Sequence, residues 1–265
     1  MNKISIEGCQ FAYEVMGTGS PTVVLETGIG AESSEWGPVA SIIARSNAVF
    51  RYDRAGRGES DPGKGNRDAQ TMVDELQALL EATQTKGPYL LVGHSFGGLL
   101  MRLFASTKSS SVHGLVLVES MHRRQFEVLG PAFPDPSPSD APALVQMRTF
   151  WRGGWRDPNS TVEHIDFERS FAQDQAVTSL GNLPLFTITA ASSLNMPFVS
   201  DASARQRMQL LWDELQADLS HLSDNRRTLF LEKSGHFVQR DDPDSVVMAI
   251  EALLPNRTRV KNNPA

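Results

Sequence analysis

The sequence predicts an α/β fold, namely a doubly wound, mostly parallel sheet with a helical cap inserted between two strands. Two observations carry this prediction. Short apolar runs alternate with helix-length amphipathic segments, as in a parallel sheet covered by helices on both faces. A single long stretch without any strand-like run, residues 121–183, interrupts the alternation.

The expected strands are apolar, largely β-branched runs that end at turn residues. Residues 4–6 and 11–15 flank Gly8 and predict an opening hairpin. The later runs are residues 22–25, 48–50, 89–92, 115–118, 185–188 and 228–231. Runs of this composition suit strands that are buried on both faces.

The expected helices show apolar residues at helical spacing. They cover residues 71–82, 96–105, 203–219 and 242–254, and the last begins at an Asp242 N-cap followed by Pro243. Residues 143–151 and 162–180 predict two more helices inside the 121–183 insertion. Because a crossover connection usually needs far fewer residues, we expect a core domain of residues 1–120 and 184–265 and a cap of residues 121–183.

Composition narrows the class of protein. The chain has 265 residues, 40% hydrophobic and 21% charged, with a net charge of −6, so we expect a large folded domain and no nucleic-acid partner. Cys9 is the only cysteine, which excludes an intrachain disulfide. No segment resembles a signal peptide or a membrane span. We therefore expect a cytoplasmic protein with no membrane partner; the oligomeric state stays open.

The pentapeptide from Gly93 to Gly97 reads G-H-S-F-G. A predicted strand enters it and a predicted helix leaves it, the setting in which G-x-S-x-G forms a nucleophile elbow. Glycines are needed there because flanking side chains would collide with the neighbouring strand and helix. Ser95 is therefore the predicted nucleophile, and His94 is expected to point away from it.

A serine hydroxyl needs a neighbouring base. Among six histidines, His236 alone lies between the last predicted strand and the last predicted helix. In a doubly wound sheet, that loop lies at the same edge as the loop holding Ser95. His236 is therefore the predicted general base.

Three segments carry a family resemblance: residues 93–97, the loop 52–60 (YDRAGRGES) and residues 234–236 (SGH). Together they resemble the α/β-hydrolase superfamily, and most closely its lidded esterase and hydrolase members, over nearly the whole chain. The resemblance implies that residues 121–183 correspond to the family's cap. It also implies that residues 53–60 have a structural role, so no chemistry is assigned to them.

The resemblance implies an acidic third catalytic residue, usually placed after the strand that precedes the histidine strand. Residues 189–195 contain no carboxylate, and Asp201 lies farther along the loop. Glu119 ends the run 115–118, and some family members carry the acid one strand earlier. We favour Glu119 over Asp201, because a carboxylate buried at that edge would be costly without a partner.

Acyl transfer also needs hydrogen-bond donors for the oxyanion. The backbone N–H of Phe96 follows the nucleophile and is one candidate. The second is the N–H of Ile29, in the loop that follows the run 22–25. Many relatives have His-Gly in this loop, whereas this chain has Thr27-Gly28, a departure that leaves backbone donation intact.

These residues predict a serine hydrolase that cleaves a carboxylic ester of a small, largely apolar substrate through an acyl-enzyme, with no metal or organic cofactor. Some apolar residues of the insertion should face the pocket and the others should form the core of the cap; the candidates are Met121, Phe126, Phe133, Phe150, Trp151 and Trp155. Four arginines leave an anionic substrate open: Arg123, Arg124, Arg152 and Arg156. The alternatives are a lactonase, an amidase or a C–C bond hydrolase, or a ligand-binding receptor built on a hydrolase scaffold.

Overall fold

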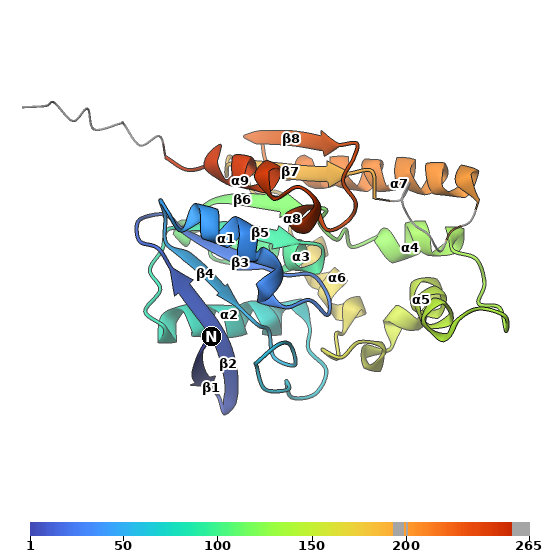
Figure 1. Ribbon diagram of the computed structural model, residues 1–265, viewed down its shortest axis with the longest axis horizontal. Coiled ribbons are helices and arrows are strands. Elements are labelled where there is room, and N and C mark those ends of the chain that lie inside the picture. Colours follow the sequence, from blue (N-terminus) through green and yellow to red (C-terminus); the bar gives the residue numbers. More distant parts are fainter. Residues whose placement is uncertain (193–198, 200, 256–265) are drawn as a thin grey trace, which may run out of the picture.

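The structure, a computed structural model, describes residues 1–192, 199 and 201–255. Within these residues, eight strands form one sheet in the order β1-β2-β4-β3-β5-β6-β7-β8 (Figure 1). The first two strand pairings are antiparallel and all the others are parallel. The strands are β1 (Asn2–Ile6), β2 (Cys9–Met16), β3 (Thr22–Glu26), β4 (Val49–Tyr52), β5 (Tyr89–His94), β6 (Val112–Val118), β7 (Leu185–Ala190) and β8 (Arg226–Leu231).

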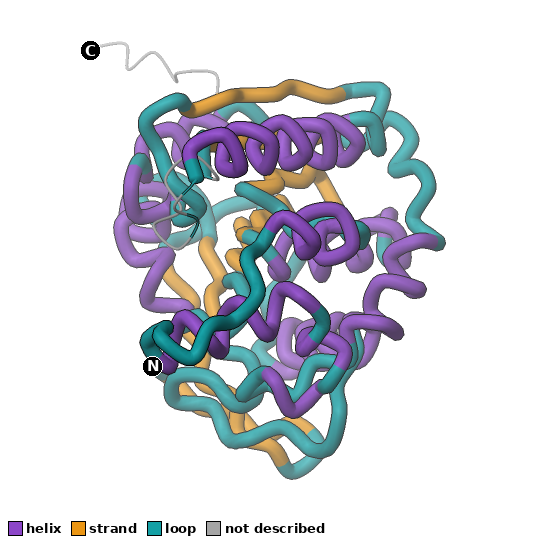
Figure 2. The backbone as a smooth tube through the Cα atoms, turned by 90° about the vertical axis from the view of Figure 1, so that its right-hand side faces the viewer, coloured by secondary structure: helices purple, strands orange, loops and turns teal. Residues whose placement is uncertain are grey.

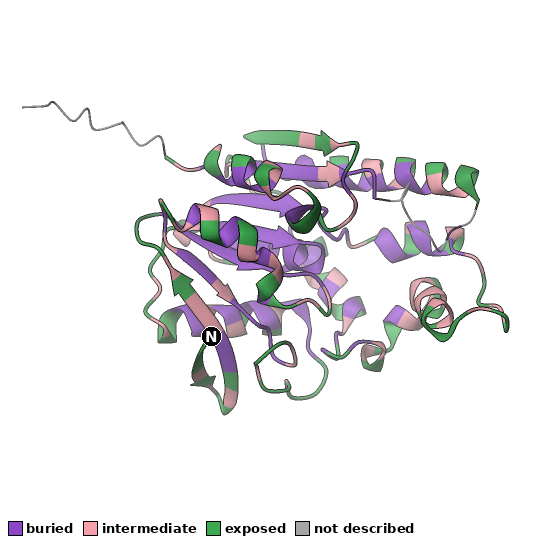
Figure 3. Ribbon diagram, in the orientation of Figure 1, coloured by how far each residue is buried: buried purple, intermediate pink, exposed green. Residues whose placement is uncertain are grey.

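Helices cover both faces of the sheet because side chains alternate along the central strands. The helices of the core are α1 (Gly37–Ile43), α2 (Ala69–Ala82), α3 (Phe96–Thr107), α7 (Ala202–Ser220), α8 (Val238–Asp241) and α9 (Pro243–Glu251). On β3, Val23 and Leu25 join the core beneath α1 and α9, whereas Val24 joins the core beneath α2 and α3. Figure 3 shows the central strands as a continuous buried layer. The predicted fold class is confirmed.

Between β6 and β7 the chain forms α4 (Gln125–Leu129), α5 (Pro142–Arg152) and α6 (Phe167–Gln175), joined by short 3-10 turns. Helices α4 and α5 lie beyond the carboxyl ends of the parallel strands, to the right in Figure 1, and Figure 2 looks toward the sheet from that side. The division of the chain into a cap of residues 121–183 and a core domain of residues 1–120 and 184–265 stays a prediction. The second segment of that core domain extends past residue 255, the last described residue.

One expected helix is shorter than predicted. Residues 162–180 were expected to be helical throughout, but α6 begins only after Asp166, whose carboxylate accepts a hydrogen bond from the N–H of Arg169. The preceding residues instead run beside Arg67, with the N–H of Arg67 donating to His164 O at 2.9 Å. Backbone pairing with a segment distant in sequence therefore replaces the first helical turn. Across the described residues, no helix has the length and apolarity that a membrane crossing requires.

Candidate functional site

The predicted nucleophile elbow is a sharp turn between β5 and α3. Ser95 has φ 52° and ψ −120°, a backbone conformation that L-residues rarely adopt. A Cβ atom on Gly93 would lie 2.4 Å from the carbonyl oxygen of Gly97, and one on Gly97 would lie 2.5 Å from that of Thr27. Only glycine fits at either position. Strain maintained in this way is typical of functional sites.

Glu119 and His236 meet at the carboxyl edge of the sheet. Glu119 directly follows β6 and is fully buried, and His236 lies between β8 and α8. His236 Nδ1 is 3.3 Å from Glu119 Oε2. Ser95 and His236 line the same cavity, although no hydrogen bond joins these two described side chains. In unliganded enzymes such contacts are often longer than in the substrate complex.

Two further donors fix the carboxylate of Glu119. The N–H of Ala190 donates to Oε1 at 2.6 Å, and the indole N–H of Trp212 lies 3.0 and 3.2 Å from the two oxygens. Asp201, the other predicted candidate, instead caps α7, where it accepts the N–H groups of Ser203 and Ala204. Of the two carboxylates, only that of Glu119 is held against His236. Trp212 was missed because its distance in sequence gives no sign of this contact.

His94 is more closely involved in the site than the sequence suggests. It lines the cavity, and its ring centroid is 4.8 Å from that of His236. Burial, together with the neighbouring His236, lowers the pKa of His94 well below its usual value, so the ring is neutral near pH 7. Its Nε2–H therefore donates to the carbonyl oxygen of His236 at 2.8 Å. His94 does not simply pack away from Ser95; it anchors the loop that carries the predicted base.

The predicted oxyanion donors flank Ser95. A Cβ atom on Gly28 would lie 3.2 Å from Ser95 Cβ, so the loop of residues 27–30 passes directly beside the elbow. Ile29 lines the cavity, and Phe96 is the first residue of α3. Within the described part of the chain, the N–H groups of both residues have no hydrogen-bond partner. Of the two residues, only Ile29 is among those that line the cavity, and the role of both as oxyanion donors stays a prediction.

A cavity of about 670 Å³ lies over these residues. Its wall is mostly apolar, and no aspartate, glutamate, lysine or arginine among the described residues lines it. Most of the predicted pocket residues do line it, whereas Phe133 and Trp155 do not. The apolar wall comprises Ile29, Met121, Phe126, Leu129, Ala143, Met147, Phe150, Trp151, Val162, Trp212 and Phe237.

The four arginines that left an anionic substrate open do not line the cavity. Arg123 faces Asp174 and Asp218, and Arg152 pairs with Asp135. Arg156 pairs with Glu168 and stacks on a tryptophan ring. Arg124 is exposed and, like the other three, is not part of the cavity wall. The cavity wall thus contains no aspartate, glutamate, lysine or arginine among the described residues. No group of three or more described His, Cys, Asp or Glu side chains could hold a metal ion.

The chain has a mostly parallel sheet, a serine at a sharp turn on the carboxyl edge of that sheet, and an apolar cavity above it. These features define a hydrolase of the α/β class. Sequence comparison gives the family, because residues 23–249 match the model of the Alpha/beta hydrolase family. The chain belongs to that family, and the predicted resemblance is confirmed.

Individual relatives are distant. The uncharacterized protein YqjL of Bacillus subtilis is 27% identical over 249 residues, which is 93% of this chain and 88% of that protein. A thermophilic esterase from Thermogutta terrifontis has a similar structure (TM-score 0.62, 17% identity, 95% of this chain and 97% of that one). So does the enol-lactonase from Burkholderia xenovorans (TM-score 0.65, 16% identity, 95% and 99%). At these identities, the structural likeness shows the fold alone.

Proposed function

We propose that this hydrolase cleaves a carboxylic ester of an uncharged, largely apolar substrate through an acyl-enzyme. Ser95 is the nucleophile, His236 the general base and Glu119 the acid that orients it. The observation that carries the proposal is the contact of 3.3 Å between His236 and the buried Glu119, together with the cavity that both His236 and Ser95 line.

The proposed reaction has two halves. His236 Nε2 takes the proton of Ser95 as the serine oxygen attacks the ester carbonyl, and Glu119 stabilises the imidazolium that forms. The N–H groups of Ile29 and Phe96 bind the oxyanion. His236 then protonates the leaving alcohol, and the acyl-enzyme is hydrolysed when His236 activates a water molecule in the same way.

The cavity wall supports an uncharged substrate. Binding a charged group in an apolar pocket without a partner is costly, and no lysine or arginine among the described residues lines the wall. The amide side chains of Gln125 and Gln146 line the cavity and can hydrogen-bond a neutral polar group. A lactone, which is a cyclic ester, needs the same chemistry, and the structural likeness to an enol-lactonase makes it the first substrate to compare with open-chain esters.

Labelling with a fluorophosphonate and turnover of p-nitrophenyl butyrate test the proposal together. The unmodified protein should be labelled at Ser95 and should hydrolyse the ester, and Ser95→Ala should lose both properties. Ser106→Ala, on the exposed side of α3, is the matched control and should keep both the labelling and the ester hydrolysis. Ligand-induced thermal stabilisation without labelling or turnover would instead support the receptor alternative. Panels of esters, lactones and amides then distinguish the enzyme classes.

A further inference from the structure

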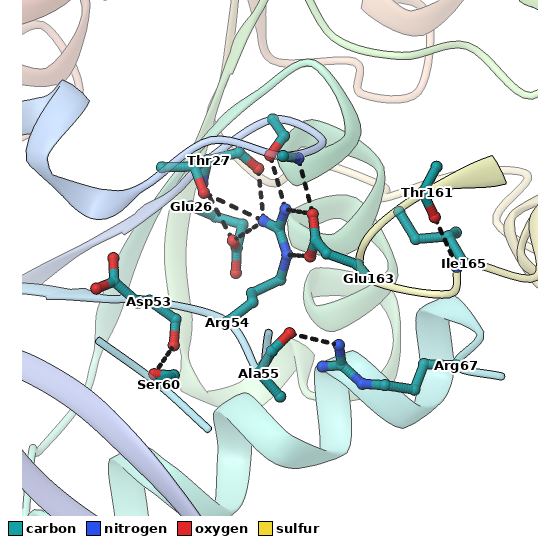
Figure 4. Close-up of polar contacts among 12 residues, drawn as sticks. Glu26, Thr27, Asp53, Arg54, Ala55, Ser60, Arg67, Thr161, Glu163 and Ile165 are labelled. Carbon is teal, nitrogen blue, oxygen red and sulfur yellow. Dashed lines mark hydrogen bonds and ion pairs between the residues drawn. The ribbon is translucent and has the colours of Figure 1, made fainter. Parts of the chain in front are cut away.

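A buried cluster of polar side chains lies behind the 27–30 loop. We call Glu26, Tyr52, Arg54 and Glu163 the Arg54 cluster; Figure 4 draws the contacts of Arg54 with Glu26 and Glu163. Arg54 is 1% exposed, and each of its five N–H groups has an acceptor. Its Nε and NH2 groups donate to Glu163 at 2.6 and 2.9 Å. NH1 donates to Glu26 at 2.6 Å, and Tyr52 donates to the second oxygen of Glu26.

The two remaining N–H groups of Arg54 hold the loop itself. One donates to the carbonyl oxygen of Thr27 and the other to that of Gly28, each at 2.7 Å. In a trans peptide the C=O and the N–H point in opposite directions. Because Arg54 draws the carbonyl of Gly28 toward itself, the N–H of Ile29 in the same peptide faces the other way, and Ile29 lines the cavity. Arg54 thus sets the direction of a proposed oxyanion donor.

Glu163 reaches the same loop from the insertion. Its Oε1 accepts the N–H of Gly30 at 2.8 Å as well as the NH2 group of Arg54. Burial alone would raise the pKa of Glu163, but the charge and hydrogen bonds of Arg54, the N–H of Gly30 and the charge of Arg67 together lower it. Its segment is anchored to the core by backbone hydrogen bonds to Arg67 on both sides of Ile165. Glu163, which lies between β6 and β7, therefore helps to fix the 27–30 loop, which follows β3.

Stability alone does not account for such a cluster, because buried ion pairs can often be replaced by apolar side chains at little cost. We propose that Arg54 and Glu163 are positioning residues that orient the peptide between Gly28 and Ile29 toward the cavity, so that the oxyanion site forms only when the Glu163 segment is docked. This inference rests on the proposed function, because it assigns the Ile29 N–H to the oxyanion.

Glu163→Gln is the primary test. In either orientation of the new amide, its NH2 group opposes an N–H of Arg54 or Gly30, so the loop loses its fixed direction. Removing one oxyanion donor costs about 10²- to 10³-fold in kcat, and we expect a misdirected donor to cost about 10- to 100-fold. KM should change by less than about threefold, because ground-state binding depends on the apolar wall.

Asp174→Asn is the matched control. Asp174, on α6, binds Arg102, on α3, with contacts of 2.6 and 2.9 Å, the same distances as in the Arg54–Glu163 pair. It also ties the insertion to the core but does not contact the 27–30 loop. Both variants should lower Tm, whereas kcat of Asp174→Asn should stay within about threefold of the unmodified protein. All assays are run about 15 °C below the Tm of each variant.

An alkyl boronic acid adds a readout that a merely structural role would not change. Its tetrahedral adduct with Ser95 places one oxygen in the oxyanion site, so its affinity should fall by about the same factor as kcat/KM in Glu163→Gln and should not fall in Asp174→Asn. If Glu163→Gln does not fold, Glu163→Asp keeps the charge beside Arg54 but withdraws the carboxylate from Gly30, and the same loss in kcat is expected.

The outcomes separate the two proposals. An unmodified protein that is neither labelled nor active refutes the proposed function, and with it the inference. An active unmodified protein whose Glu163 variant keeps kcat and boronate affinity within about threefold refutes the inference alone. So does an equal loss of kcat in Asp174→Asn, because it would show that kcat follows general stability.

Discussion

Replacing Glu119 with glutamine changes which nitrogen of His236 carries the proton. In the structure the carboxylate accepts hydrogen bonds from Ala190, Trp212 and His236. The single side-chain oxygen of a glutamine would face the N–H groups of Ala190 and Trp212, because these groups can only donate. Its NH2 group then faces His236 Nδ1, which must become the acceptor. The proton moves to Nε2, the nitrogen that receives the proton of Ser95 in the proposed mechanism.

The expected loss follows from this wrong tautomer. The equivalent carboxylate-to-amide change in a serine protease lowers kcat about 10⁴-fold, with the site geometry intact. At about 1.4 kcal/mol for each factor of ten, this corresponds to about 5 kcal/mol of transition-state stabilisation. Stability should change much less, because the buried group remains hydrogen-bonded to Ala190 and Trp212. The loss should therefore appear in kcat and not in Tm.

Hydrolysis of p-nitrophenyl butyrate by Glu119→Gln and by Asp201→Asn provides the measurement. Asparagine can still cap α7, so the Asp201 variant should keep kcat within about twofold and lose less than about 1 kcal/mol of stability. If Glu119→Gln keeps more than about a tenth of the normal kcat, the tautomer argument is refuted. If Asp201→Asn loses more than about tenfold while Glu119→Gln does not, the acid has been assigned to the wrong carboxylate.

Three further predictions follow from the described contacts. Burial lowers the pKa of both His94 and His122, so below about pH 6.5 the unfolded chain binds more protons than the folded protein. The free energy of unfolding, measured with urea, should therefore fall from pH 7 to pH 5 by at most about 1.4 kcal/mol per pH unit for each histidine. His122→Asn should reduce this dependence of the free energy of unfolding on pH. Gly97→Ala should lower stability by about 3 kcal/mol, measured by urea unfolding, because the new Cβ would lie 2.5 Å from the carbonyl oxygen of Thr27. Phe150→Ala enlarges the cavity and should raise the ratio of octanoate to butyrate hydrolysis about tenfold. The first prediction is contradicted by a free energy of unfolding that is the same at pH 5 and pH 7. The other two are contradicted by an unchanged stability of Gly97→Ala and by an unchanged ratio of octanoate to butyrate hydrolysis in Phe150→Ala.

Much of the fold could be predicted because its signals are local. Apolar runs such as residues 89–92 must be buried on both faces, and a run of this kind followed by G-x-S-x-G has few alternatives to a strand, a tight turn and a helix. The pairing of Glu119 with His236 followed from two local facts, since each residue comes just after a predicted strand and parallel strands end at one edge. The capping role of Asp201 is local as well, yet the sequence alone did not exclude it as the acid.

The remaining features depend on contacts between segments far apart in sequence. Arg54 lies in the 53–60 loop, to which the family resemblance assigned only a structural role, and its partner Glu163 is 109 positions away. Glu163 itself fell within an expected helix, because periodicity does not reveal that Asp166 delays the start of α6. One local signal was missed as well: the helix α1 was not predicted, although its Gly37-Pro38 start is typical of a first helical turn. Helical spacing and motif matching do not register such long-range pairings.

The Arg54 cluster acts on the site through orientation and not through charge. Two carboxyl groups contact one guanidinium, so the cluster has no net positive charge and provides no positive field for an oxyanion. The cavity wall adds none, since its described residues include no lysine or arginine. What reaches the cavity is the direction of a peptide N–H, a dipole that neither titrates nor depends on counterions. Oxyanion binding of this kind should therefore keep its strength over the whole pH range in which His236 is able to accept a proton, and salt should have little effect on it.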